Sequence, residues 1–363
     1  MDQKDYAGNY LEISTAALER NAKAVTEYVQ VPVIGVVKFD GYGVTLPVAA
    51  RAWQQAGVTM FAVSESWEAL ALREAGFTEQ ILLLSPVADG EILEKLLANN
   101  IILTVSDLKN AMFYLEHRGA AQLRVHVKVD TGMGRFGVRW TDAEQLRAIY
   151  KTEGLQIEGI FSHFGKSFEK NYKRTAQQLD RFLKAVEAVE QGGFKPGMRH
   201  IANSCAALRF PETRLDGVRI GSALVGALLA PVPVKLERVH TFKAQVVARK
   251  TLRKGDTTGY ASVCRVKKDT DAIVVAIGQE HGFGMTGAPD PYPLLDFAVY
   301  VYHLLQRYLR PPCVTVDGKK LPLIGRVGSQ YTLFDATGVE VQPGSYVTAN
   351  ISLLHCSSRR TFE

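Results

Sequence analysis

The chain has 363 residues, of which 47% are hydrophobic and 22% charged, so it can form a packed core and is long enough for two domains. Its net charge of +6 comes from 43 basic and 37 acidic residues that are spread along the whole chain without a Lys/Arg block. This composition excludes a disordered protein and argues against nucleic acid as a partner.

The four cysteines lie far apart, without CxxC or mixed Cys/His spacing: Cys205, Cys264, Cys313 and Cys356. We therefore expect reduced thiols and neither a metal site nor a dense disulfide framework. The first residues, MDQKDYAGNYLEIS, lack the layout of a signal peptide, and no window approaches the ~20 apolar residues of a membrane span. We expect a soluble, cytoplasmic protein.

From Tyr10 to about Gly221, short apolar and β-branched segments alternate with amphipathic segments of helical length, which often stop at glycine. The apolar segments are 33–38, 60–64, 81–85, 101–105, 123–130, 157–164, 198–204 and 217–224. Eight such βα units predict an α/β fold, namely a (β/α)8 barrel.

After Pro231 the pattern changes, which predicts a barrel domain over 1–234 and a mostly-β C-terminal domain over 235–363. Turn signals such as ValAspGly and AspAlaThrGly separate segments that read mostly as strands. These segments are 242–252, 271–278, 295–305, 313–327, 331–338 and 345–354.

Polar side chains gather at the ends of the predicted barrel strands, where the active site of such a barrel forms. They are Lys38, Lys128, Asp130, His163, Asn203, Ser204 and Arg219. A single polar residue at a strand end is usually only solvated. Their joint placement at five strand ends predicts a functional site at the barrel mouth.

Three further features suggest a ligand that carries an anion. The segment DTGMGRFG sets glycines around Arg135, either as a plain surface turn or as a tight loop that presents the guanidinium to a carboxylate or phosphate. Ser204 begins a predicted helix, and Gly221 and Ser222 follow the last strand, where barrels often bind phosphate. With Lys38 at the same mouth, these features suggest pyridoxal 5'-phosphate held as a Schiff base.

These motifs resemble those of the alanine racemase family, the fold-type III pyridoxal-phosphate enzymes, in the expected order over nearly the whole chain. VVKFDGYG (36–43) resembles the cofactor-lysine motif, HVKVDTGMGRFG (126–137) the arginine loop and FSHF (161–164) the histidine strand. HIANSCAALRF (200–210) and VRIGSALVGA (218–227) resemble the ANS and phosphate-loop motifs. GDTTGYASV (255–263) resembles the segment with the catalytic tyrosine.

The resemblance implies an amino-acid racemase that interconverts L- and D-enantiomers of alanine or a related amino acid such as serine. Lys38 would bind the cofactor and act as one base, and Tyr260 would be the base on the opposite face, reaching the site of the partner subunit in a homodimer. The cofactor would also contact Tyr42, His163, Asn203, Ser204, Arg219, Gly221 and Ser222. The substrate carboxylate would meet Arg135 and Ser329, with Lys128, often carbamylated in this family, supporting Arg135.

Several positions depart from the family pattern, and most of them lie around the substrate. Gln279 and Leu353 stand where the family has tyrosines, His281 replaces an acid, and Ser329-Gln330 replaces a Met-Asp pair. A racemase for another amino acid is therefore an open alternative.

Two other classes are open as well. A fold-type III amino-acid decarboxylase would place a glutamate where this chain has Arg219. A cofactor-binding relative without catalysis would not need Tyr260.

Overall fold

The protein is described by a computed structural model covering residues 8–169, 171–228, 230–285 and 294–363. The side chains at positions 260, 294–296, 303, 307 and 355 are outside the described part. The chain divides into two compact units, Thr15–Val239 and a second unit that joins the residues up to Ser14 to His240–Glu363.

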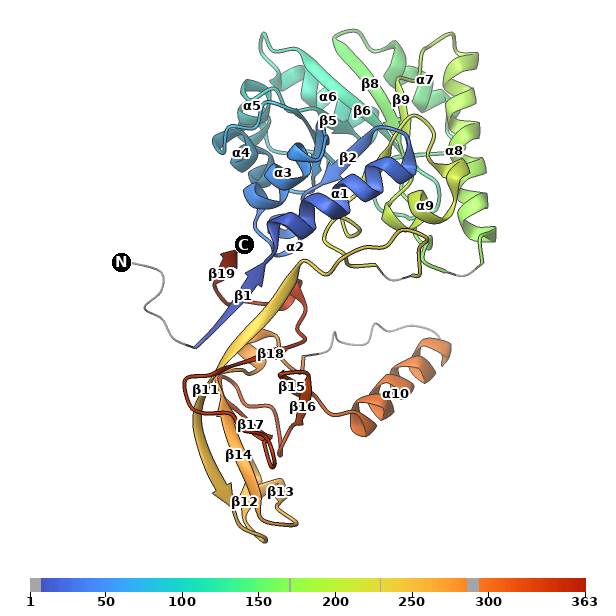
Figure 1. The fold of residues 1–363 in the computed structure, drawn as a ribbon. Coiled ribbons are helices and arrows are strands. Elements are labelled where there is room, and N and C mark those ends of the chain that lie inside the picture. The colour runs from blue at the N-terminus through green and yellow to red at the C-terminus, as the bar shows by residue number, and fades with distance from the viewer. Residues whose placement is uncertain (1–7, 170, 229, 286–293) are drawn as a thin grey trace. The chain divides into compact units, whose positions relative to one another are not determined.

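The first unit is a (β/α)8 barrel, which confirms the predicted fold (Figure 1). Its strands are β2 (Val33–Val36), β3 (Met60–Val63), β4 (Gln80–Leu83), β5 (Leu103–Val105), β6 (Leu123–Asp130), β8 (Leu155–Phe161), β9 (Met198–His200) and β10 (Val218–Ile220). They pair in parallel in the orders β10-β2-β3-β4 and β5-β6-β8-β9. Two further contacts close the barrel. A bridge between Leu82 and Ile102 joins β4 to the residue before β5. The Arg219 N–H donates to the Ala202 carbonyl at 3.0 Å and joins β10 to the loop after β9. Each predicted apolar segment overlaps one of these strands, although β4 and β8 begin one and two residues before the predicted segments.

Helices surround the strands (Figure 1). They are α1 (Thr15–Val29), α2 (Phe39–Tyr42), α3 (Leu46–Gln55), α4 (Ser66–Glu74), α5 (Gly90–Ala98), α6 (Leu108–His117), α7 (Ala143–Lys151), α8 (Lys173–Gln191) and α9 (Ser204–Arg209), with η1 (Pro211–Thr213) and the short strand β7 (Val138–Arg139). The carboxylates of Asp89, Asp107 and Asp142 accept backbone N–H groups at the starts of α5, α6 and α7, which explains why these helices begin there.

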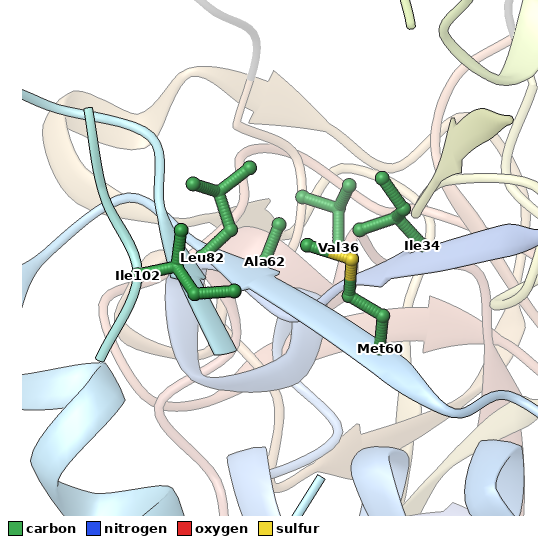
Figure 2. Packing of buried hydrophobic residues seen from close by; sticks show 6 residues of the cluster. All are labelled: Ile34, Val36, Met60, Ala62, Leu82 and Ile102. Carbon is green, nitrogen blue, oxygen red and sulfur yellow. The ribbon is translucent and has the colours of Figure 1, made fainter. Parts of the chain in front are cut away.

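Apolar side chains from neighbouring strands fill part of the barrel. The cluster consists of Ile34, Val36, Met60, Ala62, Leu82 and Ile102, all buried (Figure 2). Successive residues of a strand point to opposite faces, so Ile34 and Val36 share a face. Lys38 is the next residue in this alternation, and it lies just beyond the end of β2.

The second unit is mostly β, as predicted. Its strands are β1 (Asn9–Ile13), β11 (His240–Leu252), β12 (Thr257–Thr258), β13 (Cys264–Arg265), β14 (Thr270–Val275), β15 (Cys313–Val316), β16 (Lys319–Pro322), β17 (Thr332–Asp335), β18 (Tyr346–Ala349) and β19 (Arg360–Phe362). The order β16-β15-β18-β11-β1-β19 forms the main sheet, and β14 joins it at β11. The single-turn helices are η2 (Tyr260–Ser262), η3 (Gln279–His281) and η4 (Leu353–His355).

The first strand differs from the predicted domain division, which placed residues 1–234 in the barrel. β1 pairs antiparallel with β11 and parallel with β19, so it belongs to the C-terminal unit. Leu11 and Ile13 are fully buried in this position. The pairing partners lie over 220 residues away in sequence, so local pattern could not show where this strand would go.

One segment that was interpreted as a strand is a helix. Residues 295–305 lie within α10 (Leu294–Leu309), because leucines and polar residues recur at helical spacing although valine and tyrosine favour strands. The ValAspGly signal is confirmed as a turn, since Asp317 and Gly318 have φ of 48° and 77° between β15 and β16. Within the described ranges, no helix combines the length and the hydropathy that crossing a membrane requires.

Candidate active site

Lys38 is followed by a left-handed turn that is unusual for residues with side chains. Phe39, Asp40 and Tyr42 have φ of 54°, 51° and 57°, a region that costs non-glycine residues about 1–2 kcal/mol each. The Asp40 carboxylate accepts the Leu46 N–H at 2.7 Å and holds the turn against α3. Such strain persists where the surrounding structure enforces it, often at functional sites. Here it leaves the Lys38 Nζ 6.0 Å from the centre of the Tyr42 ring.

The electrostatic surroundings of Lys38 favour its neutral amine. Burial lowers the pKa of this lysine, and the positive charge of Arg135 lowers it further, while Glu68 acts in the opposite direction. A larger neutral fraction makes the Nζ a better nucleophile and base near neutral pH.

Hydrogen-bond donors converge where β10 ends and α9 begins. The N–H groups of Gly221 and Ala223 both donate to the Ser204 Oγ, at 3.2 and 3.4 Å. The Tyr42 hydroxyl lies so close to Gly221 that a Cβ there would collide with it. Burial raises the pKa of Tyr42, so its hydroxyl keeps its proton and can donate. Ser222 lies between the two amides, and its carbonyl accepts the Ala227 N–H at 2.8 Å. We call Tyr42, Ser204, Gly221, Ser222 and Ala223 the anion cradle.

Gly221→Ala is expected to weaken binding of pyridoxal 5'-phosphate by at least ~10-fold, because the new methyl group displaces the Tyr42 hydroxyl from the cradle. Equilibrium titration followed by cofactor absorbance measures this. Gly165→Ala is the matched control, since a Cβ there meets only the Gln178 Oε1, at 3.9 Å. Equal affinity in Gly221→Ala and the wild type would contradict the cradle.

Arg219 on β10 is buried among three histidines. Its Nη2 lies 3.2 Å from the His163 Nδ1, and its Nη1 lies 2.8 Å from the His200 Nδ1. The His200 Nε2 in turn lies 2.8 Å from the His126 Nδ1. Arginine can only donate, so the Nδ1 atoms of His163 and His200 accept, and the His200 Nε2 carries the proton that it donates to His126.

The three histidines around Arg219 are neutral near neutral pH. Burial, followed by the charges of Arg219 and Arg124, lowers the pKa of His126 to about 3. Burial and then Arg219 hold the pKa values of His163 and His200 well below the usual range. The pKa of Arg219 falls to about 9 through burial, which still leaves it charged at pH 7. One buried positive charge is thus surrounded by neutral acceptors.

The lowered pKa of His126 predicts that acid destabilises the fold. Between pH 6.5 and 3 the unfolded chain binds a proton at His126 that the folded chain does not, so the free energy of unfolding falls as pH falls. Because His126→Gln removes this proton uptake, the fall between pH 7 and pH 5 should be about 2 kcal/mol smaller than in the wild type. Urea unfolding at both pH values measures it, with the exposed His117→Gln as the control. An equal fall in His126→Gln and the wild type would contradict the assignment.

The arginine loop is held by a carboxylate. The Asp130 Oδ1 accepts the N–H groups of Gly132 and Met133 at 2.8 and 2.9 Å, and its Oδ2 accepts that of Gly134 at 3.1 Å. Burial alone would raise the pKa of Asp130, but these three donors outweigh it and the pKa lies below its usual value. The loop thereby sets Arg135 beside Lys128, and both residues line one small cavity with His163.

Lys128 is buried with its Nζ 4.3 Å from the centre of the Phe161 ring. Burial, Arg219 and Arg135 hold its pKa well below the usual range, which favours the neutral amine. A charged Lys128 would repel the charged Arg135 beside it, and a neutral Lys128 amine removes that repulsion.

Asn203 has a structural role in this fold. Its Oδ1 accepts the Ala206 N–H at 3.1 Å as the cap of α9 and the Ser167 hydroxyl at 2.7 Å. The structure thus brings the predicted barrel residues together at one mouth, and it assigns the cap to Asn203, with Ser204 as the first residue of the helix.

The remaining predicted residues belong to the C-terminal unit. Tyr260 begins η2, and its side chain lies outside the described part. Ser329 is exposed in a loop whose carbonyl groups accept backbone N–H groups, Gly328 from Gln279 at 2.9 Å and Ser329 from Glu280 at 3.1 Å. Thus Gln279 and Ser329, two of the unusual positions, lie on two segments that are joined by backbone hydrogen bonds.

His281 and Leu353, two further unusual positions, are structural in this unit. The His281 Nδ1 accepts the Gly278 N–H at 3.1 Å, which closes the turn of η3. Leu353 is buried at the start of η4.

Sequence reasoning missed His126 and His200. The available signal was the alternation of side chains along β6, in which His126 points to the same face as Lys128 and Asp130. His200 ends β9, three residues before Asn203, the cap of α9. Each begins a motif that carries the resemblance, 126–137 and 200–210, but neither was given a role of its own.

A barrel mouth that combines a lysine of lowered pKa, an anion cradle and a buried arginine is suited to a phosphorylated carbonyl cofactor, and with the β unit it defines a fold-type III pyridoxal-phosphate enzyme. The family models "Alanine racemase, N-terminal domain" and "Alanine racemase, C-terminal domain" match residues 13–228 and 239–350. The chain belongs to the alanine racemase family, whose members are pyridoxal-phosphate-dependent amino-acid racemases.

Individual relatives agree with this. The chain is 33% identical over 285 residues to an alanine racemase of Desulforamulus reducens, covering 76% of each chain. It is 30% identical over 344 residues to alanine racemase 2 of Caldanaerobacter subterraneus, covering 91% of this chain and 82% of that one. The structure of alanine racemase from Bacillus anthracis with bound L-Ala-P matches with a TM-score of 0.84 and 26% identity over 99% of this chain and 95% of that one.

Proposed function

We propose that this protein racemises alanine at the barrel mouth, with pyridoxal 5'-phosphate as cofactor and with Lys38 and Tyr260 as the two bases. The observation that carries the proposal is the joint presence of the Lys38 amine and the anion cradle at one barrel mouth. The names of the relatives support alanine as the substrate.

The residues present fit the cofactor. A phosphate needs convergent donors, and the cradle gathers two backbone N–H groups with the hydroxyls of Ser204 and Tyr42; a phosphate would replace the Ser204 Oγ as acceptor of the two N–H groups. A Cβ at Gly221 would fill this space, which explains the glycine. When bound, pyridoxal 5'-phosphate supplies an electron-withdrawing ring that stabilises negative charge at the substrate α-carbon.

Racemisation needs a proton to leave one face of the α-carbon and another to arrive at the opposite face. In one direction the Lys38 Nζ accepts the α-proton and Tyr260 donates its hydroxyl proton to the other face. In the reverse direction the two residues exchange these roles, and between turnovers in one direction exchange with solvent removes the proton from Lys38 and returns one to Tyr260. Lowering of the pKa of Lys38 by burial favours the neutral amine that accepts a proton.

Arg219 would lie beside the pyridine nitrogen of the cofactor. A charged guanidinium donates a hydrogen bond but does not transfer its proton to the weaker base. The neutral His163 and His200 hold the guanidinium in place, at 3.2 and 2.8 Å. This environment limits how much charge the ring accepts, which favours return of the proton to the α-carbon over transamination.

Arg135 would bind the substrate carboxylate, with Lys128 beside it. The neutral amine of Lys128 is the form that reacts with carbon dioxide, so carbamylation would convert this position to an anion that pairs with Arg135. Ser329 would contribute from the C-terminal unit.

We infer that the enzyme works as a cytoplasmic homodimer. Within the described part of the chain the four cysteines form no disulfide, which suits a reducing compartment. A homodimer allows Tyr260 of one copy to complete the site of the other, giving two equivalent sites.

A panel of L- and D-amino acids tests the proposed function. With purified protein and cofactor, chiral chromatography should show alanine racemisation in both directions. Serine turnover would indicate that Gln279, Ser329 and Leu353 widen the specificity. Formation of the decarboxylated amine, or no reaction with any amino acid, would contradict the proposal.

A further inference from the structure

Helix α10 presents apolar side chains to solvent. Phe297, Tyr308 and Leu309 are 63%, 85% and 71% exposed, and Val299, Leu304 and Leu305 are also exposed. These positions occur on more than one face of the helix. A helix that is apolar around its circumference is normally buried, and large exposed apolar patches mark interaction sites.

The barrel unit carries a groove that could receive such a helix. It lies between α6 and α7, has a volume of about 890 Å³, and its lining includes the apolar residues Leu108, Met112 and Phe113. Met112 is 45% exposed although its side chain is apolar.

The charges of the groove and of the α10 segment are complementary. Around the groove, four carboxylates accompany a single lysine: Asp107, Glu116, Asp142 and Glu144 with Lys109. By sequence, residues 294–310 contain two arginines and one aspartate, and Arg310 is exposed directly after the helix. A basic apolar helix therefore matches an acidic apolar groove.

The groove also lies at the relevant end of the barrel. Asp107 and Asp142 are the caps that begin α6 and α7, so the groove includes the helix ends that follow β5 and the arginine loop, at the mouth. The proposed homodimer brings Tyr260 of one copy to the mouth of the other. The unit that carries Tyr260 also carries α10.

We infer that α10 of one copy docks in the groove between α6 and α7 of its partner. This inference rests on the homodimer of the proposed function. Each copy offers one helix and one groove, so the dimer contains two such contacts related by its two-fold axis. They add apolar contacts between the copies beside the shared active sites.

Cross-linking tests the contact directly. Chains with Met112→Cys are mixed with chains with Leu305→Cys and treated with a short bis-maleimide. We expect a covalent dimer in the mixture, above the background from Cys264 and Cys313 seen in wild type and in each variant alone. Absence of this product overturns the inference. A cross-linked monomer in the double variant, without a dimer in the mixture, would show that the helix docks within its own chain and would also overturn it.

Sedimentation gives an independent result. Leu305→Glu and Tyr308→Glu should each raise the dimer dissociation constant by at least ~10-fold. The matched control is Trp67→Glu on α4, also an exposed apolar residue, with unchanged dissociation expected. Thermal unfolding shows that each variant is folded.

The outcomes separate the two proposals. A wild-type dimer whose dissociation constant is unchanged by both α10 variants refutes docking of α10 and leaves the shared active site intact. A wild-type protein that is monomeric and fully active refutes both.

Discussion

Lys38→Ala is expected to lower alanine racemisation by at least ~10³-fold, because the variant loses the amine that binds the cofactor and accepts the α-proton. Reduction with borohydride should attach the cofactor to the Lys38 peptide in the wild type, as peptide mass spectrometry would show, and leave the variant unlabelled. The cradle of Ser204, Gly221 and Tyr42 is intact in this variant, so cofactor should still bind there without a covalent bond.

The control is Lys23→Ala on α1, where the lysine is 73% exposed. It should keep full activity and full labelling at Lys38. If borohydride attached the cofactor to another lysine, or if Lys38→Ala stayed active, the assignment of this residue would be wrong.

Tyr260→Phe should abolish racemisation while cofactor binding persists, because the change removes only the hydroxyl that would donate and accept the proton on the opposite face. The decisive form of this experiment is complementation. Mixing Lys38→Ala chains with Tyr260→Phe chains, both inactive alone, should restore about a quarter of wild-type activity. Random pairing makes half of the dimers mixed, and each mixed dimer has one intact site of two.

Tyr331→Phe, at another exposed tyrosine of the same unit, is the control and should be fully active. Complementation fails if Lys38 and Tyr260 act within one chain, since every chain then lacks one base. A mixture without activity, measured under conditions where subunits exchange, would therefore contradict the shared site.

The barrel could be predicted from sequence because its pattern is local. Each strand is a short apolar segment followed by an amphipathic helix, and residues such as Lys38 and Arg219 lie at strand ends that the alternation locates. β1 was placed in the wrong unit because its partner β11 is over 220 residues away. The helix α10 was interpreted as a strand because its valines and tyrosines favour strands locally, whereas its helical spacing was given too little weight.

For the site, the sequence predicted which residues meet and could not predict how they interact. The motifs located Ser204 and Gly221, but the hydrogen bond between them depends on the closure of β10 against β9. Asn203 was predicted to contact the cofactor, which stays a prediction, and its role as the cap of α9 could not be read from the motif. His126 and His200 were missed because their importance comes from burial beside Arg219, which depends on three-dimensional packing.

The central claim is that two bases act on opposite faces of the α-carbon, and hydrogen exchange with solvent tests it most directly. L-alanine and D-alanine are each incubated with the enzyme in deuterium oxide, and deuterium at the α-carbon is followed by nuclear magnetic resonance. The account predicts that each enantiomer yields the opposite one with deuterium at the α-carbon, and that Lys38→Ala yields none. Formation of the opposite enantiomer without deuterium, or absence of exchange from both enantiomers, would contradict it.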